Sequence, residues 1–330
     1  MSGARFSTHS SEPVMPPPPD HSNMGAVLTG ARSLHAAAYA KVNLSLEILG
    51  RRPDGFHELV SVSQIVSLAD HLTVSPAADV HVTVDPPVVD EHDNLVRRAA
   101  EALVLATSRT NGATILLKKA IPLAAGLGGG SSDAATTLRL LDRLWGTRLG
   151  HTQLAAIAAT LGSDVALFLA GGTSLMRGRG EDVEPLPAAR TFWLVLICPG
   201  GSPPDKTRAL YHALSPDEWS DGETTLALAE RLRSGGTIEG QPFVNSFDRA
   251  ADRVYPNFPA LRRQLADLTD APWQLTGAGP TLFARFATAI AAQGAAQVLQ
   301  RAGIDAHTAR TIARRPAIRA SRAPAARFLP

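Results

Sequence analysis

Apolar and polar positions alternate every second residue in several short segments, which is the pattern of half-buried strands. These segments predict strands over residues 42–49, 59–68, 71–74, 114–118, 193–198, 281–286 and 307–312. Apolar residues at helical spacing predict helices over residues 94–106, 134–145, 154–161 and 290–302, and mainly helices from 205 to 268. Strands and helices mix without a regular strand–helix–strand repeat, so the sequence predicts an α+β fold in two lobes.

The two ends of the chain differ in composition from the middle. Residues 1–33 are rich in Ser, Pro and Gly, and they predict a disordered leader, with order beginning near His35. This leader lacks the apolar core of a secretory signal, and its acidic residues and proline run argue against a transit peptide. Residues 316–330 predict a basic, disordered tail.

Composition and charge restrict the class of protein. The chain has 330 residues, 45% of them apolar, which suits one large domain or two moderate ones. No apolar run approaches the roughly 20 residues that span a bilayer, so no membrane partner is expected. The single cysteine, Cys198, excludes an intramolecular disulfide and fits a reducing cytoplasm.

Charge is distributed unevenly along the chain. The net charge is +2, but residues 301–330 contain seven arginines and one aspartate. A basic end can contact nucleic acid, but this one has little aromatic interleaving, so a solvated tail without a nucleic-acid partner is the favoured interpretation. Lysine is scarce, with Lys41, Lys118, Lys119 and Lys206 against 28 arginines. This bias suggests coding drift more than function, but each lysine is worth examining, since arginine serves most surface roles but not every site role.

A glycine-rich segment over residues 121–133 leads directly into a predicted helix. It contains Gly126, Gly128, Gly129 and Gly130. Glycines leave room for a phosphate, Ser131 or Ser132 could cap the helix, and a helix N-terminus favours an anion. The spacing fits neither the dinucleotide fingerprint nor the Walker loop. A flexible turn is the alternative, but the strong helix start favours a nucleotide phosphate site.

Three segments together resemble the motifs of the GHMP small-molecule kinases. The sequence Lys-Val-Asn-Leu at 41–44 resembles the first motif, residues 122–134 the ATP loop, and Leu-Thr-Gly-Ala-Gly-Pro-Thr at 275–281 the third motif. Residues 50–59, which include Asp-Gly-Phe-His, resemble the branch that phosphorylates a cytidine-diphosphate alcohol in the non-mevalonate isoprenoid route. The resemblance covers residues 36–315.

This resemblance implies a two-lobed fold, with an N-terminal lobe like ribosomal protein S5, an α/β C-terminal lobe and an active site in the cleft. The ATP-binding domain would span residues 34–188 and the C-terminal domain residues 189–315. It also implies a cytoplasmic enzyme, a monomer or weak homodimer. The enzyme would use ATP and Mg²⁺ to phosphorylate the 2-hydroxyl of a methylerythritol carried on cytidine diphosphate.

The resemblance implies two catalytic residues, Lys41 and Asp164. Asp164 would accept the proton of the acceptor hydroxyl, although an aspartate in its place could also be a helix cap or a turn residue. Lys41 would keep Asp164 ionised and stabilise charge on the attacking oxygen. Asn43 lies two residues further along the same strand face and would bind the polyol or the diphosphate of the acceptor.

The acceptor site is also implied by the resemblance. Phe56 and Tyr211 would sandwich the cytosine and His57 would bond its polar edge, because stacking alone accepts any base. The alternative for Phe56 is core packing. Thr207 lies four residues before Tyr211 on a helix and faces the same way. The glycines of the third motif complete this site as Gly277 and Gly279.

The resemblance places the ATP loop at Pro122, Leu123, Ala124, Ala125, Gly126, Leu127, Gly128, Gly129, Gly130, Ser131 and Ser132. Lys119 could reach a phosphate. Asn94 resembles an adenine-side residue, although an asparagine before a helix is commonly only a cap. Ser131 or Ser132 is the candidate Mg²⁺ ligand, and Asp133 is a weaker one.

Two other functions remain as alternatives. Another GHMP kinase would act on mevalonate, homoserine or a sugar, but these substrates offer no base for His57 and Tyr211. A nucleotide-binding regulator without catalysis is the alternative from a different class. The presence of both Lys41 and Asp164 argues against it.

Overall fold

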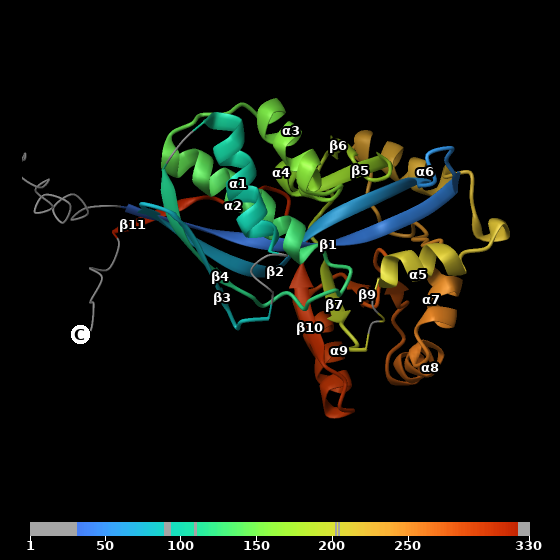
Figure 1. The fold of residues 1–330 in the computed structure, drawn as a ribbon. Helices are drawn as coiled ribbons and strands as arrows, with labels where there is room; N and C mark the ends of the chain where they lie inside the picture. The colour runs from blue at the N-terminus through green and yellow to red at the C-terminus, as the bar shows by residue number, and fades with distance from the viewer. Residues whose placement is uncertain (1–31, 89–93, 109–110, 202, 204, 323–330) are drawn as a thin grey trace, which may run out of the picture.

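The computed structural model describes residues 32–88, 94–108, 111–201, 203 and 205–322. They form two β-sheets with helices packed against them (Figure 1). The first sheet has seven strands, in the order β11-β1-β2-β4-β3, with β5 pairing β2 and β6; the second has four, in the order β10-β7-β9-β8. The α+β fold in two lobes is therefore confirmed.

The first sheet is built on two long strands. Its strands are β1 (Arg32–Arg51), β2 (His57–Ala77), β3 (Val80–Asp85), β4 (Gly112–Lys118), β5 (Thr173–Gly178), β6 (Asp182–Leu186) and β11 (Arg319–Arg322). The two strands predicted over 59–68 and 71–74 are one continuous strand, β2. Asp70 does not interrupt it, because its buried carboxylate accepts hydrogen bonds from Ala120 N and Ile121 N.

Helices from the first half of the chain cover one face of this sheet (Figure 1). They are α1 (Leu95–Thr107), α2 (Gly129–Trp145), α3 (His151–Leu161) and α4 (Val165–Ala170). Leu103 and Leu138 from these helices pack with Leu72 and Ile115 from the strands, all fully buried. Burial of each such side chain stabilises the fold by about 1.5–3 kcal/mol.

The second sheet is antiparallel and lies on the other side of the first sheet (Figure 1). Its strands are β7 (Trp193–Ile197), β8 (Gln274–Leu275), β9 (Leu282–Phe286) and β10 (Ala306–Arg310). Leu194 and Phe283 of this sheet share a core with Val42 and Val62 of the first. This common core fixes the two sheets against each other.

The helices of the second half are α5 (Lys206–Ala213), α6 (Glu223–Arg233), α7 (Asp248–Val254), α8 (Phe258–Leu268) and α9 (Ala289–Arg301), with a 3₁₀ turn at Pro216–Glu218. Helix α6 packs on β1 and β2, whereas α9 packs on the second sheet. No helix within the described ranges is long and apolar enough to cross a membrane.

Both ends of the described chain lie in the first sheet. β1 begins at Arg32 and pairs antiparallel with β11, from Arg32↔Arg322 to His35↔Arg319. The predicted disordered tail is therefore wrong for residues 319–322, and the predicted leader is wrong for residues 32 and 33. Arg139 donates to the Pro316 carbonyl at 2.8 Å and helps to hold this segment. Residues 1–31 and 323–330 lie outside the described residues, and the predicted domain boundaries stay predictions.

Ending the chain after residue 315 is expected to lower the free energy of unfolding by about 2 kcal/mol. The truncation removes the ladder between β11 and β1 and also Ile318, which packs against the core. Urea denaturation would measure the loss. A chain that ends after Arg322 keeps β11 and serves as the control, and identical midpoints for the two truncated chains would contradict a stabilising role for β11.

Candidate active site

The site is assembled along the outer edge of β1. The register of β1 against β2 shifts between Tyr39 and Lys41 and again between Asn43 and Ser45. Such irregularities redirect side chains and backbone groups. The backbone N–H of Lys41 donates to the carbonyl of Leu127 at 3.0 Å, and that of Asn43 donates to Thr276 Oγ1 at 2.8 Å. The first motif therefore holds the glycine loop and the third motif directly.

The glycine loop leads into a helix as predicted, but α2 begins already at Gly129. Its N-cap is Gly128, with φ of 70° and no side-chain cap bond, so the prediction that Ser131 or Ser132 caps it is wrong. A Cβ on Gly128 would lie 2.7 Å from the Phe168 ring, and one on Gly126 2.7 Å from the Gly279 oxygen. These glycines are thus required by close packing as well as by the backbone conformation.

A cavity of about 250 Å³ lies at this loop, called here the donor cavity. Lys119 and residues 122–131, which are predicted to bind ATP, line this cavity, and the binding of ATP there stays a prediction. Ser131 faces the cavity, whereas Ser132 is 1% exposed and does not line it. The side chain of Asn94 accepts a hydrogen bond from Val96 N at 2.9 Å, which confirms the capping interpretation. Asn94 does not line the donor cavity, and its adenine contact stays a prediction.

Lys119 is already paired with two buried carboxylates. Its Nζ forms ion pairs with Asp70 and with Asp133, the latter at 2.8 Å. Burial raises the pKa of Asp133 to about 8, against the opposing effect of Lys119. Burial alone would lower the pKa of Lys119, but Asp133 and Asp70 together raise it. The triad ties β2, the end of β4 and the start of α2 together, so its first role is to fix the loop.

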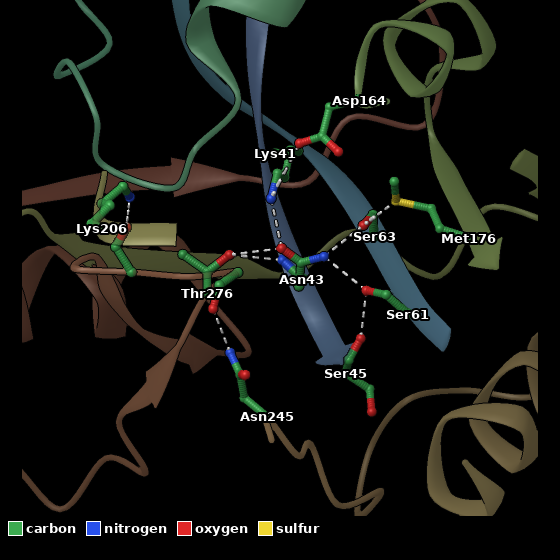
Figure 2. A network of polar contacts seen from close by, with 12 residues as sticks. Lys41, Asn43, Ser45, Ser61, Ser63, Asp164, Met176, Lys206, Asn245 and Thr276 are labelled. Carbon is green, nitrogen blue, oxygen red and sulfur yellow. Dashed lines mark hydrogen bonds and ion pairs between the residues drawn. The ribbon is translucent and has the colours of Figure 1, made fainter. Parts of the chain in front are cut away.

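Lys41 and Asp164 lie together beside this loop (Figure 2). Their charged atoms, Nζ and Oδ2, are 3.9 Å apart; Lys41 is buried, and the Asp164 side chain is 38% exposed. Burial lowers the pKa of Lys41, while Asp164 acts to raise it. Asp164 stands at the N-cap of α4 but makes no side-chain cap bond. The alternative interpretation of Asp164 as a helix cap is therefore not supported by a capping hydrogen bond.

Asn43 holds Lys41 in place (Figure 2). Lys41 Nζ donates to Asn43 Oδ1 at 2.6 Å, and Asn43 Nδ2 donates to Ser61 Oγ at 2.7 Å and Ser63 Oγ at 3.0 Å. Both ends of the amide are thus occupied by protein groups. This geometry favours positioning of Lys41 over the direct substrate contact predicted for Asn43, which stays a prediction.

Two further cavities continue from the donor cavity. The central cavity, of about 320 Å³, is lined by Lys41, Asp164 and Gly277. It borders a groove of about 1590 Å³, here the acceptor groove, that contains Arg51 and the predicted acceptor residues Phe56, His57, Thr207 and Tyr211. Ala124 lines all three cavities. A continuous path therefore leads from the glycine loop past Asp164 to the aromatic side chains.

One aromatic ring of the acceptor groove already has a partner within the protein, and the predicted cytosine sandwich between Phe56 and Tyr211 stays a prediction. Tyr211 stacks on His57, with ring centroids 4.6 Å apart and planes at 22°. Phe56 is 54% exposed, which rules out core packing, and the Arg179 guanidinium lies 4.7 Å from its ring centroid. Burial, then the charges of Arg51 and His212, lower the pKa of His57. A neutral His57 offers both a hydrogen-bond donor and an acceptor to a ligand.

Three residues of the site had no role predicted from the sequence. Asn245 Nδ2 donates to the carbonyls of Leu275 and Gly277, at 3.0 and 2.9 Å, and so holds the third motif. Arg179 and Lys206 line both the central cavity and the acceptor groove. Lys206 was signalled by the scarcity of lysine; no sequence pattern distinguished the other two.

Residues 94–172 match the family model described as GHMP kinases N terminal domain. The 4-diphosphocytidyl-2-C-methyl-D-erythritol kinase of Dehalococcoides mccartyi is 42% identical over 247 residues, which cover 74% of this chain and 87% of the relative. The chain belongs to this family of kinases. The family's member from Moorella thermoacetica is 38% identical over 285 residues, covering 83% of this chain and 98% of the relative.

Solved structures agree with this assignment. A crystal structure of 4-(cytidine 5'-diphospho)-2C-methyl-D-erythritol kinase aligns with a TM-score of 0.72 at 34% identity, covering 84% of this chain and 98% of that one. Homoserine kinase from Cytophaga hutchinsonii aligns with a TM-score of 0.67 at 18% identity, covering 87% and 97%, which shows a shared fold alone. The resemblance and the two-lobed GHMP kinase fold predicted from the three motifs are confirmed.

Replacement of Asp133 by Asn is expected to change how stability depends on pH. The pKa of Asp133 rises on folding to about 8. The free energy of unfolding therefore decreases as the pH increases from the pKa of the unfolded aspartate toward 8. Asparagine does not titrate. The stability of the wild type relative to Asp133→Asn should therefore fall by about 1 kcal/mol per pH unit between pH 5 and 8.

Urea denaturation at pH 5, 6, 7 and 8 would measure this difference. Replacement of the exposed Asp217 by Asn is the matched control, and its stability should run parallel to that of the wild type. A constant difference between the wild type and Asp133→Asn over this range would show that Asp133 does not titrate there.

Proposed function

We propose that the protein transfers the γ-phosphoryl group of ATP to the 2-hydroxyl of 4-diphosphocytidyl-2-C-methyl-D-erythritol, in the non-mevalonate route to isoprenoid precursors. The observation that carries this proposal is the order of the three cavities: donor cavity, central cavity with Lys41 and Asp164, acceptor groove with aromatic side chains. Such an order suits transfer between a nucleotide and a long acceptor.

The donor is ATP as its magnesium complex. Backbone N–H groups at the start of α2 and the positive end of its dipole favour the phosphates. Among the residues that the structure describes, no group of three His, Cys, Asp or Glu side chains could hold a metal. The Ser131 hydroxyl, which lines the donor cavity, would hold Mg²⁺ together with the phosphates of ATP, and the ion would neutralise the negative charge on them.

Asp164 and Lys41 perform the transfer between them. The acceptor hydroxyl gives its proton to Asp164 as its oxygen bonds to the γ-phosphorus, and the bond to the leaving ADP breaks. Lys41, held by Asn43 and with its Nζ 3.9 Å from Asp164 Oδ2, lies next to that carboxylate and stabilises negative charge on the attacking oxygen. The protein thus contributes positioning and charge rather than a covalent intermediate.

The size and lining of the acceptor groove favour a nucleotide-linked alcohol. Small-molecule pockets commonly have volumes of about 300–1,000 Å³, and the groove, at about 1590 Å³, is larger. Homoserine or mevalonate would leave most of it empty. The faces of Phe56 and of the stacked pair Tyr211 and His57 suit a pyrimidine base.

Replacement of Asp164 by Asn is expected to lower kcat by roughly 10²–10⁴-fold, because the amide cannot accept the proton. The binding of ATP should stay within about threefold of the wild type, since the donor cavity is unchanged. Single-turnover kinetics and equilibrium titration with ATP would separate these effects. An unaltered rate would remove Asp164 from the role of base.

The acceptor is expected to be selected by its nucleotide. Steady-state kinetics with ATP should give a kcat/KM for the cytidine-diphosphate acceptor at least about 10³-fold above those for homoserine, mevalonate and galactose. Turnover of one of these small alcohols in preference would assign a different GHMP kinase activity. ATP binding without turnover of any acceptor would instead support a regulator.

A further inference from the structure

Lys206, the first residue of α5, lies where three parts of the site meet. Its Nζ donates a hydrogen bond to the carbonyl oxygen of Gly279 in the third motif (Figure 2). The same oxygen lies against the glycine loop, since a Cβ on Gly126 would be only 2.7 Å from it. The ammonium group of Lys206 is therefore close to the donor loop while it stands on the wall of the acceptor groove.

The charge of Lys206 has no counter-charge in the part of the chain that the structure describes. No carboxylate there forms an ion pair with it, and its hydrogen-bond acceptor is a neutral carbonyl. Lys41, by contrast, faces Asp164. Burial, then repulsion by Lys41, lower the pKa of Lys206 to about 8. A half-buried cation of this kind is stabilised when an anion binds beside it.

Lys206 also marks the passage between the acceptor groove and the central cavity. The residues that line both are Ala124, Arg179, Lys206, Thr207 and Tyr211. Of the two cations among them, Arg179 has Glu181 as a partner, with Nε and Oε1 3.5 Å apart. A substrate with its base in the groove and its hydroxyl at Asp164 must carry its diphosphate through this passage.

We propose that Lys206 binds the diphosphate of the acceptor substrate at the passage from the acceptor groove to the central cavity. This inference rests on the proposed function, because it requires an acceptor whose base and alcohol are joined by a diphosphate. The ammonium group donates to a phosphate oxygen in place of, or together with, the Gly279 carbonyl. A charge-assisted bond of this kind is strong and is made only by the protonated lysine.

Acceptor binding should therefore weaken as pH rises above about 8, the pKa of Lys206. The charged and titratable residues that line the two cavities with Lys206 are Lys41, Arg51, His57, Asp164, Arg179, Asp205, Arg208, Tyr211 and His212. The pKa of His57 is lowered from its ordinary value and that of Tyr211 is raised to about 12, so neither accounts for a change near pH 8. Lys41 also has a lowered pKa, and substitution at Lys206 distinguishes the two lysines.

The test compares Lys206→Met, Lys206→Arg and the wild type between pH 7 and 9.5. At pH 7.5, Lys206→Met should raise the KM of the acceptor about tenfold or more, with the KM of ATP and kcat within about threefold. Lys206→Arg should keep the acceptor KM within about threefold and abolish its rise above pH 8, because arginine stays charged. Lys118→Met, at an exposed position of β4 outside the three cavities, is the matched control and should behave as the wild type.

Three results would overturn the inference: an unchanged acceptor KM in Lys206→Met, a rise in the KM of ATP instead, or a rise above pH 8 that persists in Lys206→Arg. Failure of the wild type to phosphorylate the cytidine-diphosphate acceptor would overturn the proposed function instead. In that case, titration calorimetry with inorganic pyrophosphate would test whether Lys206 binds a diphosphate. Lys206→Met should bind pyrophosphate about tenfold more weakly than Lys118→Met, and equal affinities would refute the role of Lys206.

Discussion

The outer edge of a sheet must satisfy its backbone N–H and C=O groups, and the edge of β1 does so with the segments that form the active site. β11 covers its first four residues. The glycine loop covers Lys41, Thr276 covers Asn43, and the segment around Val244 and Ser246 covers the edge beyond. These segments take the place of a neighbouring strand. The glycine loop, the third motif and Lys41 are therefore held in one frame by ordinary backbone hydrogen bonds.

Three of the four lysines stand in the site, and they differ in how their charge is balanced. Lys119 is held between two buried aspartate side chains, Asp70 and Asp133, which fix it beneath the loop. Lys41 has one partly exposed carboxylate, which a substrate can reach. Lys206 has only a carbonyl oxygen. The fewer negative charges the protein supplies, the more the cation is available to a bound phosphate.

The sequence pattern predicted those features that depend on neighbouring residues, such as helix starts and caps. The cap of α1 at Asn94 and the helix after the glycine loop follow from neighbouring residues. The polar Asp70 concealed the continuity of β2, because its partners Ala120 and Ile121 come about fifty residues later. The sequence pattern did not predict strands β3, β5, β6 and β8, and β11 is a strand only because β1 lies beside it. The contact between Lys206 and Gly279 joins residues 73 positions apart, which no spacing along the chain can reveal.

The pairing of β11 with β1 has a consequence for how the chain folds. The strands of the second sheet all lie in the chain between β6 and β11, so the second lobe is in effect an insertion into the first. During synthesis the outer edge of β1 at residues 32–35 stays unpaired until β11 has left the ribosome. The first strand of the first sheet is made early and its last strand is made late. The pairing of β1 with β11 therefore joins residues very far apart in the sequence.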